Sequence, residues 1–302
     1  MFKRMIEKDP ATVFAAPALI WQIVFLYVPL IVIVCSSFLV LREGGGFSAS
    51  LHYYLELFKP EYFKVLRNSF LLASATTLVC FLIAYPVSYY LAFAKSRWRN
   101  FLLVLLILPS WTNFIVQIYA WFFLLGNNGF VSKLLYYSGV THQPLHLVNN
   151  SFATLIGMTY CYIPFMIFPL YSVLEKLDKR LIEASADLGA SRTATLRRVI
   201  VPLSVPGIVA GVLLVFVPAF GEFAVPLLLG GSRHVFWGTI IVEKFLISRD
   251  WYGGFAFATL GVGMLISVVC TLQFTRFVYK TVRKRALIKH KPQETFLGGE
   301  WS

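Results

Sequence analysis

Two carboxylates stand four residues apart in a short segment of small residues, IEASADLGAS (182–191). Glu183 and Asp187 share one face of a helix at that spacing. The three residues between them are Ala, Ser and Ala, so the helix is thin and another protein surface can approach its backbone. The residues alone allow two interpretations: a docking helix whose carboxylates meet basic groups on a partner, or a solvated amphipathic loop helix.

A third carboxylate, Glu222, stands alone in the apolar stretch PAFGEFAVP (218–226). An isolated charge at the centre of a bilayer costs at least about 2.5–3.5 kcal/mol, so it is expected to face a pathway or a partner. A buried negative charge would attract ammonium groups. The alternative is a structural hydrogen bond that holds a broken helix or a seam between two subunits.

Three aromatic residues lie in the same kind of apolar surroundings, namely Trp111, Tyr119 and Trp121. Their faces could bind a passing cation through cation–π contacts. Aromatic side chains are also routine at membrane interfaces, and that interpretation remains open for all three.

Other chemistry has little support in the chain. The phosphate-binding pattern G-x-x-x-x-G-K-[ST] is missing, and EGGGFS (43–48) is a glycine loop without the lysine. His142 and His146 are four residues apart but have no evident third ligand, so we expect no metal site. No nucleophile set of Ser/His/Asp or Cys/His type is recognisable. We therefore expect no catalytic residues and no ATP hydrolysis by this chain.

The composition indicates the elements that must carry these residues. The chain is 58% hydrophobic and only 14% charged, with a mean hydropathy of +0.72. Together with several apolar runs above about 18 residues, this predicts an all-α, polytopic membrane protein. The six predicted spans are 13–41, 68–94, 101–125, 152–174, 207–230 and 255–279.

The positive charges predict the orientation. With the N-terminus in the cytoplasm, the inside segments hold 18 of the 27 Lys and Arg residues and the outside segments hold 8. This is the positive-inside pattern, so both termini are predicted to be cytoplasmic. The net charge of +13 then reflects topology, and we expect no nucleic-acid partner. The predicted parts are a cytoplasmic N-terminal tail (1–12), a membrane domain (13–279) with a cytoplasmic loop (175–206), and a basic C-terminal tail (280–302).

The cytoplasmic loop carries clear helix signals. Asp178 can cap a helix over Lys179–Leu188, and Gly189 is placed as its stop. A second short helix follows, with Ser191 as cap, Arg192–Val201 as the helix, and Pro202 and Pro206 as its end. The predicted product is a helix, a glycine turn and a second helix at the membrane face.

This segment resembles the EAA loop of ABC importer permeases. The matching residues are Glu183-Ala184-Ser185-x-x-x-Gly189 and, after nine further residues, Val199-x-Val201-Pro202. The family pattern has Ala at the position of Ser185, and Ile and Leu at those of Val199 and Val201. The stretches 108–125, 162–178 and 217–231 resemble the spermidine/putrescine branch of the same family. Gln117 departs from it, because a basic residue often stands there.

The resemblance implies a type I permease fold in the bacterial inner membrane and a set of partners. These are a cytoplasmic ATP-binding subunit dimer that uses ATP and Mg, a second permease in a heterodimer, a periplasmic binding protein, membrane lipids and a small cationic substrate. It implies no cofactor on this chain. The ATPase-coupling residues that it implies are Glu183, Ala184, Asp187, Leu188, Gly189 and Ala190.

Several functions are therefore to be distinguished. The resemblance favours the channel-forming subunit of an ATP-driven polyamine importer that works by alternating access. A permease for another small cation or amino-acid derivative is the first alternative. An ion-coupled secondary transporter is permitted by composition, although no convincing inverted repeat is present. A membrane enzyme or an assembly factor has the least support.

Overall fold

The computed structural model describes residues 10–41, 46–94, 98–126, 129–139, 147–231 and 235–289. Six helical segments are long and apolar enough to cross a membrane. They are Ala15–Ser36, Pro60–Phe93, Phe114–Tyr137, Ser151–Glu175, Arg192–Gly221 and Trp251–Thr271. The prediction of an all-α bundle with six spans is confirmed. The orientation of the termini stays a prediction.

The first span leads into a small hairpin. Helices α2 (Pro10–Gln22), η1 (Ile23–Tyr27) and α3 (Val28–Ser36) form one helical run. Strands β1 (Leu39–Leu41) and β2 (Phe47–Ala49) then pair antiparallel. The predicted span 13–41 was therefore too long at its end, because its last residues enter a strand.

Three helices form the centre of the molecule: α5 (Pro60–Phe93), α9 (Ser151–Glu175) and α12 (Val201–Gly221). Small residues let α9 and α12 approach closely. A Cβ atom added at Gly211 would lie 2.6 Å from the Met166 sulfur, and one at Gly207 would lie 2.8 Å from the Pro169 carbonyl oxygen. This four-residue glycine spacing is a common helix-packing device in membranes.

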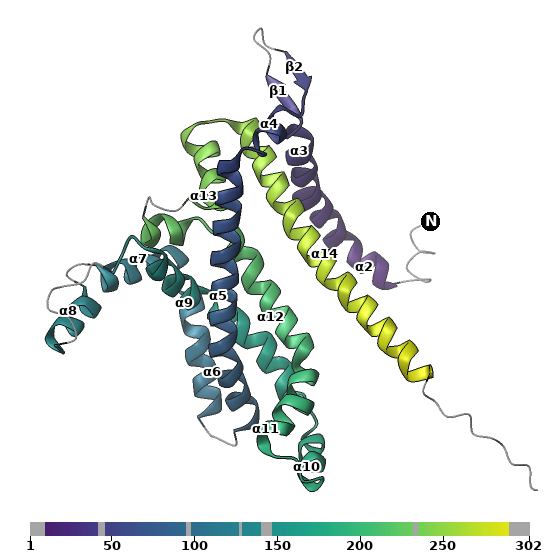
Figure 1. Ribbon diagram of the computed structural model, residues 1–302. Helices are drawn as coiled ribbons and strands as arrows, with labels where there is room; N and C mark the ends of the chain where they lie inside the picture. Colours follow the sequence, from purple (N-terminus) through teal and green to yellow (C-terminus); the bar gives the residue numbers. More distant parts are fainter. Residues whose placement is uncertain are drawn as a thin grey trace, which may run out of the picture.

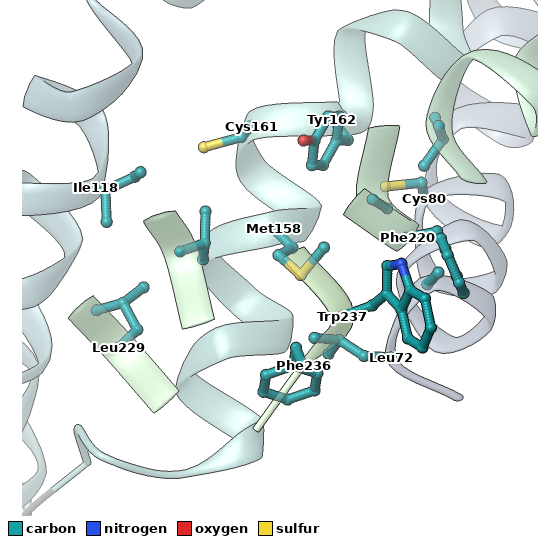
Figure 2. Packing of buried hydrophobic residues seen from close by; sticks show 14 of the residues in the cluster. Leu72, Cys80, Ile118, Met158, Cys161, Tyr162, Phe220, Leu229, Phe236 and Trp237 are labelled. Carbon is teal, nitrogen blue, oxygen red and sulfur yellow. The ribbon is translucent and has the colours of Figure 1, made fainter. Parts of the chain in front are cut away.

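Buried side chains continue this core toward the predicted outer end. Figure 2 shows Met158 of α9 among Leu72, Phe236 and Trp237, with Phe220 nearby. Trp237 belongs to α13 (Trp237–Val242), a short helix that η5 (Glu243–Ile247) extends. The Trp237 amide donates a hydrogen bond of 2.7 Å to the Ser69 hydroxyl. A segment before the last span is thus fixed to α5.

The long last helix, α14 (Trp251–Lys289), packs along α3. Figure 1 shows this pair diverging from α5, α9 and α12 toward the end where α10 lies. The short helix α4 (His52–Glu56) contacts α14 at the other end. Because α14 continues to Lys289, the beginning of the predicted tail 280–302 is helical.

The third predicted span, 101–125, was wrong as a single helix. The structure has α6 (Arg99–Ile107), a 3₁₀ turn η2 (Leu108–Trp111) and then α7 (Phe114–Leu125). Thr112 and Asn113 have extended backbone. Pro109 removes a backbone donor, and the Asn113 side chain accepts a hydrogen bond from Ile115 N (2.9 Å) and starts a new helix. Helix α8 (Phe130–Tyr137) follows α7.

The fifth predicted span, 207–230, was misplaced at both ends. The helix begins at Arg192, stops at Gly221, and is separated from the turn η4 (Pro226–Gly230) by a non-helical break. Pro226 cannot donate a hydrogen bond that would continue the helix across this break. Glu222 itself is extended, with φ −67° and ψ 133°.

The predicted stop at Pro202 and Pro206 was also wrong. Helix α11 (Arg192–Thr195) runs through the wide turn η3 (Leu196–Ile200) directly into α12. In that turn the Val201 amide donates to the Leu196 carbonyl, five residues back. Pro202 then occupies the first turn after the wide turn, a position where a missing N–H is tolerated.

Candidate functional site

The loop that carries the two neighbouring carboxylates folds as predicted in its first half. Helix α10 (Lys179–Asp187) begins where the Asp178 side chain accepts a hydrogen bond from Arg180 N, at 3.0 Å. It ends before Gly189, whose φ of +77° lies in the region that favours glycine. Ser191 caps the next helix by accepting a hydrogen bond from Ala194 N (3.3 Å).

The two helices are locked together by one face of α10. The hydroxyls of Ser185 and Thr195 share a hydrogen bond of 2.9 Å. Ile182 and Leu196 pack beside the buried Ile200. The pair is therefore attached to the same continuous helix that becomes α12.

The opposite face of α10 is open to solvent. Glu183, Ala184, Asp187 and Gly189 are exposed, Leu188 is 88% exposed, and Ala190 is half-buried. Within the described part of the chain, neither Glu183 nor Asp187 forms an ion pair. Figure 1 shows α10 at one extreme end of the bundle, away from the β hairpin. The predicted residues thus form one accessible surface, which we call the α10 surface.

The lone carboxylate occupies a different setting from the one predicted. Glu222 lies at the break between α12 and η4, not within a helix. Its Oε1 accepts hydrogen bonds from the amides of Phe223 (3.0 Å) and Ala224 (2.8 Å). Its Oε2 accepts one from the Tyr162 hydroxyl of α9, at 2.6 Å. Amide donors at the start of a helical turn stabilise a negative charge, so Glu222 holds the break together and joins it to α9.

The aromatic residues at and beside the Tyr162 partner of Glu222 are not the three that were predicted. The ring of Phe114, the first residue of α7, lies 6.4 Å from that of Tyr162, and the ring of Phe165 lies at the same distance from Tyr162. Helix α7 also packs against η4. The interruptions of the third and fifth spans therefore lie close to each other, next to Tyr162. Sequence reasoning missed Tyr162, since nothing in the pattern pairs it with a residue 60 positions later.

The three predicted pathway aromatics are spread along the third span. Trp111 is 82% exposed in η2, and Tyr119 is 46% exposed on α7. Trp121 is half-buried, with its ring edge-on to Tyr160 at 5.4 Å. Among the ring and hydrogen-bond contacts of the described residues, none joins these three to Glu222.

Gln117 stabilises the other break. Its Nε2 donates to the Thr112 hydroxyl (2.8 Å) and to the Pro109 carbonyl. A neutral amide thus satisfies groups that the interrupted helix leaves free. This gives the unusual Gln117 a structural role in the chain.

Two carboxylates near the predicted outer end accept hydrogen bonds from other groups of this chain. Lys59 donates to Glu56 at 2.9 Å, and this hydrogen bond holds the pKa of Glu56 below its usual value. Asp250 accepts hydrogen bonds from Lys244 (2.7 Å) and from the Gly253 amide (3.0 Å), which caps α14.

The described residues contain no group of three or more His, Cys, Asp or Glu that could hold a metal ion. The predicted histidine pair, His142 and His146, lies outside the described residues.

Comparison with known proteins gives consistent findings. A family model described as "Binding-protein-dependent transport system inner membrane component" matches residues 84–284. The chain is 39% identical over 267 residues to the spermidine/putrescine transport system permease protein PotB of Haemophilus influenzae, covering 87% of this chain and 91% of that protein. It is 39% identical over 266 residues to PotB of Escherichia coli, covering 87% and 96%.

Solved structures agree on the fold. A bacterial ABC transporter involved in the import of the acidic polysaccharide alginate has a chain with a TM-score of 0.71, 15% identity, and coverage of 91% of this chain and 97% of that one. The same kind of transporter in complex with an alginate pentasaccharide-bound periplasmic protein gives a TM-score of 0.69 at 15% identity, with coverage of 89% and 94%. At this identity the likeness concerns the fold alone.

Proposed function

The chain belongs to the family of inner membrane components of binding-protein-dependent transport systems, and from that membership we propose that it forms the membrane passage for polyamine uptake. It is a multi-pass permease subunit of the bacterial inner membrane. Polyamines are proposed as the substrate class because the chain is 39% identical to spermidine/putrescine permeases over 87% of its length. The alginate transporters do not bear on substrate, because they share only the fold.

A fixed negative charge in the membrane suits such a cargo. Glu222 forms no ion pair among the described residues and accepts hydrogen bonds from backbone amides and the Tyr162 hydroxyl. An ammonium group could approach the remaining lone pairs of Oε2, beside the rings of Tyr162 and Phe114. We propose that the cation also contacts three aromatic rings along the pathway, those of Trp111, Tyr119 and Trp121.

The α10 surface is proposed as the docking site of the cytoplasmic ATP-binding subunits. Glu183 and Asp187 have no intramolecular cation among the described residues, so they are available to basic groups on a partner. Leu188 offers an apolar side chain to a pocket on the same partner. Gly189 and the half-buried Ala190 shape the turn behind it.

One continuous helix connects the two proposed sites. Arg192–Gly221 has 30 residues, which corresponds to about 45 Å. Its first turn is locked to α10 by the Ser185–Thr195 hydrogen bond, and its last residue precedes Glu222. Closure of the ATPase dimer would therefore move the Glu222 break through a rigid element, which supports alternating access.

The remaining partners follow from the family. They are a second permease subunit and a periplasmic binding protein, which delivers the cation. ATP and Mg would be used by the ATP-binding subunits, and this chain would bind no cofactor of its own.

Uptake measurements test this function. The chain would be expressed with its partner subunits in a bacterial host that lacks its own polyamine uptake, and radiolabelled spermidine and putrescine would be followed. We expect saturable uptake that unlabelled polyamines suppress and that cationic amino-acid derivatives leave unchanged. Suppression by those derivatives alone would favour the alternative substrate class.

A further inference from the structure

A groove that takes no part in the proposed transport mechanism opens between α5, α12 and α14. It encloses a cavity of about 410 Å³, a size typical of ligand sites. The residues that matter here are Phe63, Arg67, Phe70, Phe216, Phe220 and Met264. Four aromatic rings from two helices thus form its walls, and the walls are almost entirely apolar.

Arg67 is the charged residue of this lining. Its side chain is exposed, and the ion pairs formed within the described residues do not include it. The other polar side chain of the lining, Ser267, donates to the Met264 carbonyl at 2.7 Å. The groove therefore offers one guanidinium above an apolar slot, and its lining contains no carboxylate.

The depth of Arg67 matches the boundary between hydrocarbon and headgroups. Helix α5 has 34 residues, about 51 Å, whereas the hydrocarbon core is about 30 Å thick. About 10 Å of α5 at each end therefore reaches the headgroup region. Arg67 is the eighth residue of α5, about 10 Å from its start.

We propose that this groove binds an anionic phospholipid, with the phosphate on Arg67 and an acyl chain between the aromatic walls. Guanidinium groups bind phosphate oxygens with two parallel hydrogen bonds. A zwitterionic lipid would bring an ammonium group that finds no carboxylate in the lining, so an anionic headgroup is favoured. The lipid would lie between α14 and the central helices α5 and α12, whose residues line the groove.

Native mass spectrometry of the full-length chain tests the site with two probes, dioleoyl-phosphatidylglycerol and dioleoyl-phosphatidylcholine. Wild-type protein should retain the anionic lipid preferentially. Arg67→Gln should lower that retention about tenfold, since a hydrogen-bonded charge contributes this much or more to binding. Lys64→Gln is the matched control, because Lys64 is exposed on the same helix and does not line the cavity.

Two further measurements keep the outcome decisive. Arg67→Lys should retain part of the preference, and Ser267→Phe should lower lipid retention by filling the slot while Arg67 stays in place. Equal retention of both lipids by the wild type, or unchanged retention by Arg67→Gln, would overturn the proposal. Loss of the second permease subunit from Arg67→Gln, with lipid retention intact, would assign the groove to the interface between subunits and would also overturn it.

Discussion

Glu222 shows how one carboxylate can serve structure and still remain available to a ligand. One oxygen is occupied by backbone amides, whereas the other holds a single hydrogen bond from Tyr162. A cation that reaches this residue must therefore approach on the Tyr162 side. Replacing the charge while keeping the hydrogen-bond acceptor separates the two roles.

Glu222→Gln should raise the KM for spermidine uptake about tenfold, because a hydrogen bond to a charged group contributes roughly 1.5–3 kcal/mol whereas a neutral pair contributes about 0.5–1.5 kcal/mol. The amide oxygen can still accept from the backbone amides, so the variant should reach the membrane in normal amounts. Uptake kinetics in cells would measure this. Tyr162→Phe is the comparison, because it removes one hydrogen bond and leaves the charge. Unchanged kinetics in Glu222→Gln would remove this residue from the pathway.

The caps and the turn of the α10–α11 pair could be predicted from the sequence, whereas the partners of Glu222 could not. Asp178, Gly189 and Ser191 act through neighbours within three residues, so their signals are local. The partner of Glu222 comes from another helix, 60 residues away. Spatial neighbours of that kind are set by helix packing, which a hydrophobic pattern does not specify.

At the scale of elements, the α10–α11 pair has one face held by internal contacts and one open face. Ser185, Ile182 and Leu196 hold the inner face, and the outer face is free for a partner. Changes on the outer face should therefore disturb partner binding and leave the fold intact. Substitutions in the Gly189 turn should change the angle between α10 and α11.

Glu183→Lys should abolish co-purification of the ATP-binding subunits, because it reverses a charge on the α10 surface. Lys176→Glu, an exposed charge reversal just before α10, should leave the association intact. Pull-down of the ATPase from detergent extracts provides the measurement. Equal recovery with both variants would contradict the docking assignment.

Gly189→Ala should weaken coupling without removing the docking surface. A side chain at φ +77° costs roughly 1–2 kcal/mol, so the angle between α10 and α11 should relax. We expect reduced uptake per ATP hydrolysed, with ATPase binding retained. Gly263→Ala, at a helical glycine with open space around it, is the control. An unchanged ratio of transported cation to hydrolysed ATP in Gly189→Ala would show that this turn does not set the angle between α10 and α11.

Prolines show why the breaks in the helices were mispredicted. Pro164 and Pro169 lie inside the continuous α9, and Pro202 and Pro206 inside the continuous run to Gly221. The interruptions lie near other prolines, where Gln117 and Glu222 satisfy the freed backbone groups. A proline thus permits a break, and side chains close to it decide whether one forms. Six spans followed from hydropathy alone, but their interruptions did not.

Gly211→Leu should lower the thermal stability of the protein. The new side chain would collide with Met166, and overpacking typically costs about 1–3 kcal/mol. Thermal unfolding in detergent, followed by size-exclusion fluorescence, would detect the shift. Gly263→Ala should unfold at the wild-type temperature. The same melting temperature in both variants would contradict the close approach of α9 and α12.

In the whole molecule, one helix connects the two proposed sites, and the α3–α14 pair diverges from the central helices toward the end where α10 lies. Figure 1 shows α10 and the β hairpin at opposite ends of the molecule. The proposed mechanism requires that motion pass from α10 to the Glu222 break. ATP hydrolysis by the subunits bound at the α10 surface should therefore be linked to cation movement at the Glu222 break.

Spermidine uptake into proteoliposomes tests this link most directly. The vesicles would contain the chain with its second permease and ATP-binding subunits, with loaded binding protein outside and ATP inside. We predict saturable uptake that requires internal ATP and that Glu183→Lys abolishes. Uptake that proceeds without ATP on an imposed ion gradient, or that Glu183→Lys leaves unchanged, would contradict the account.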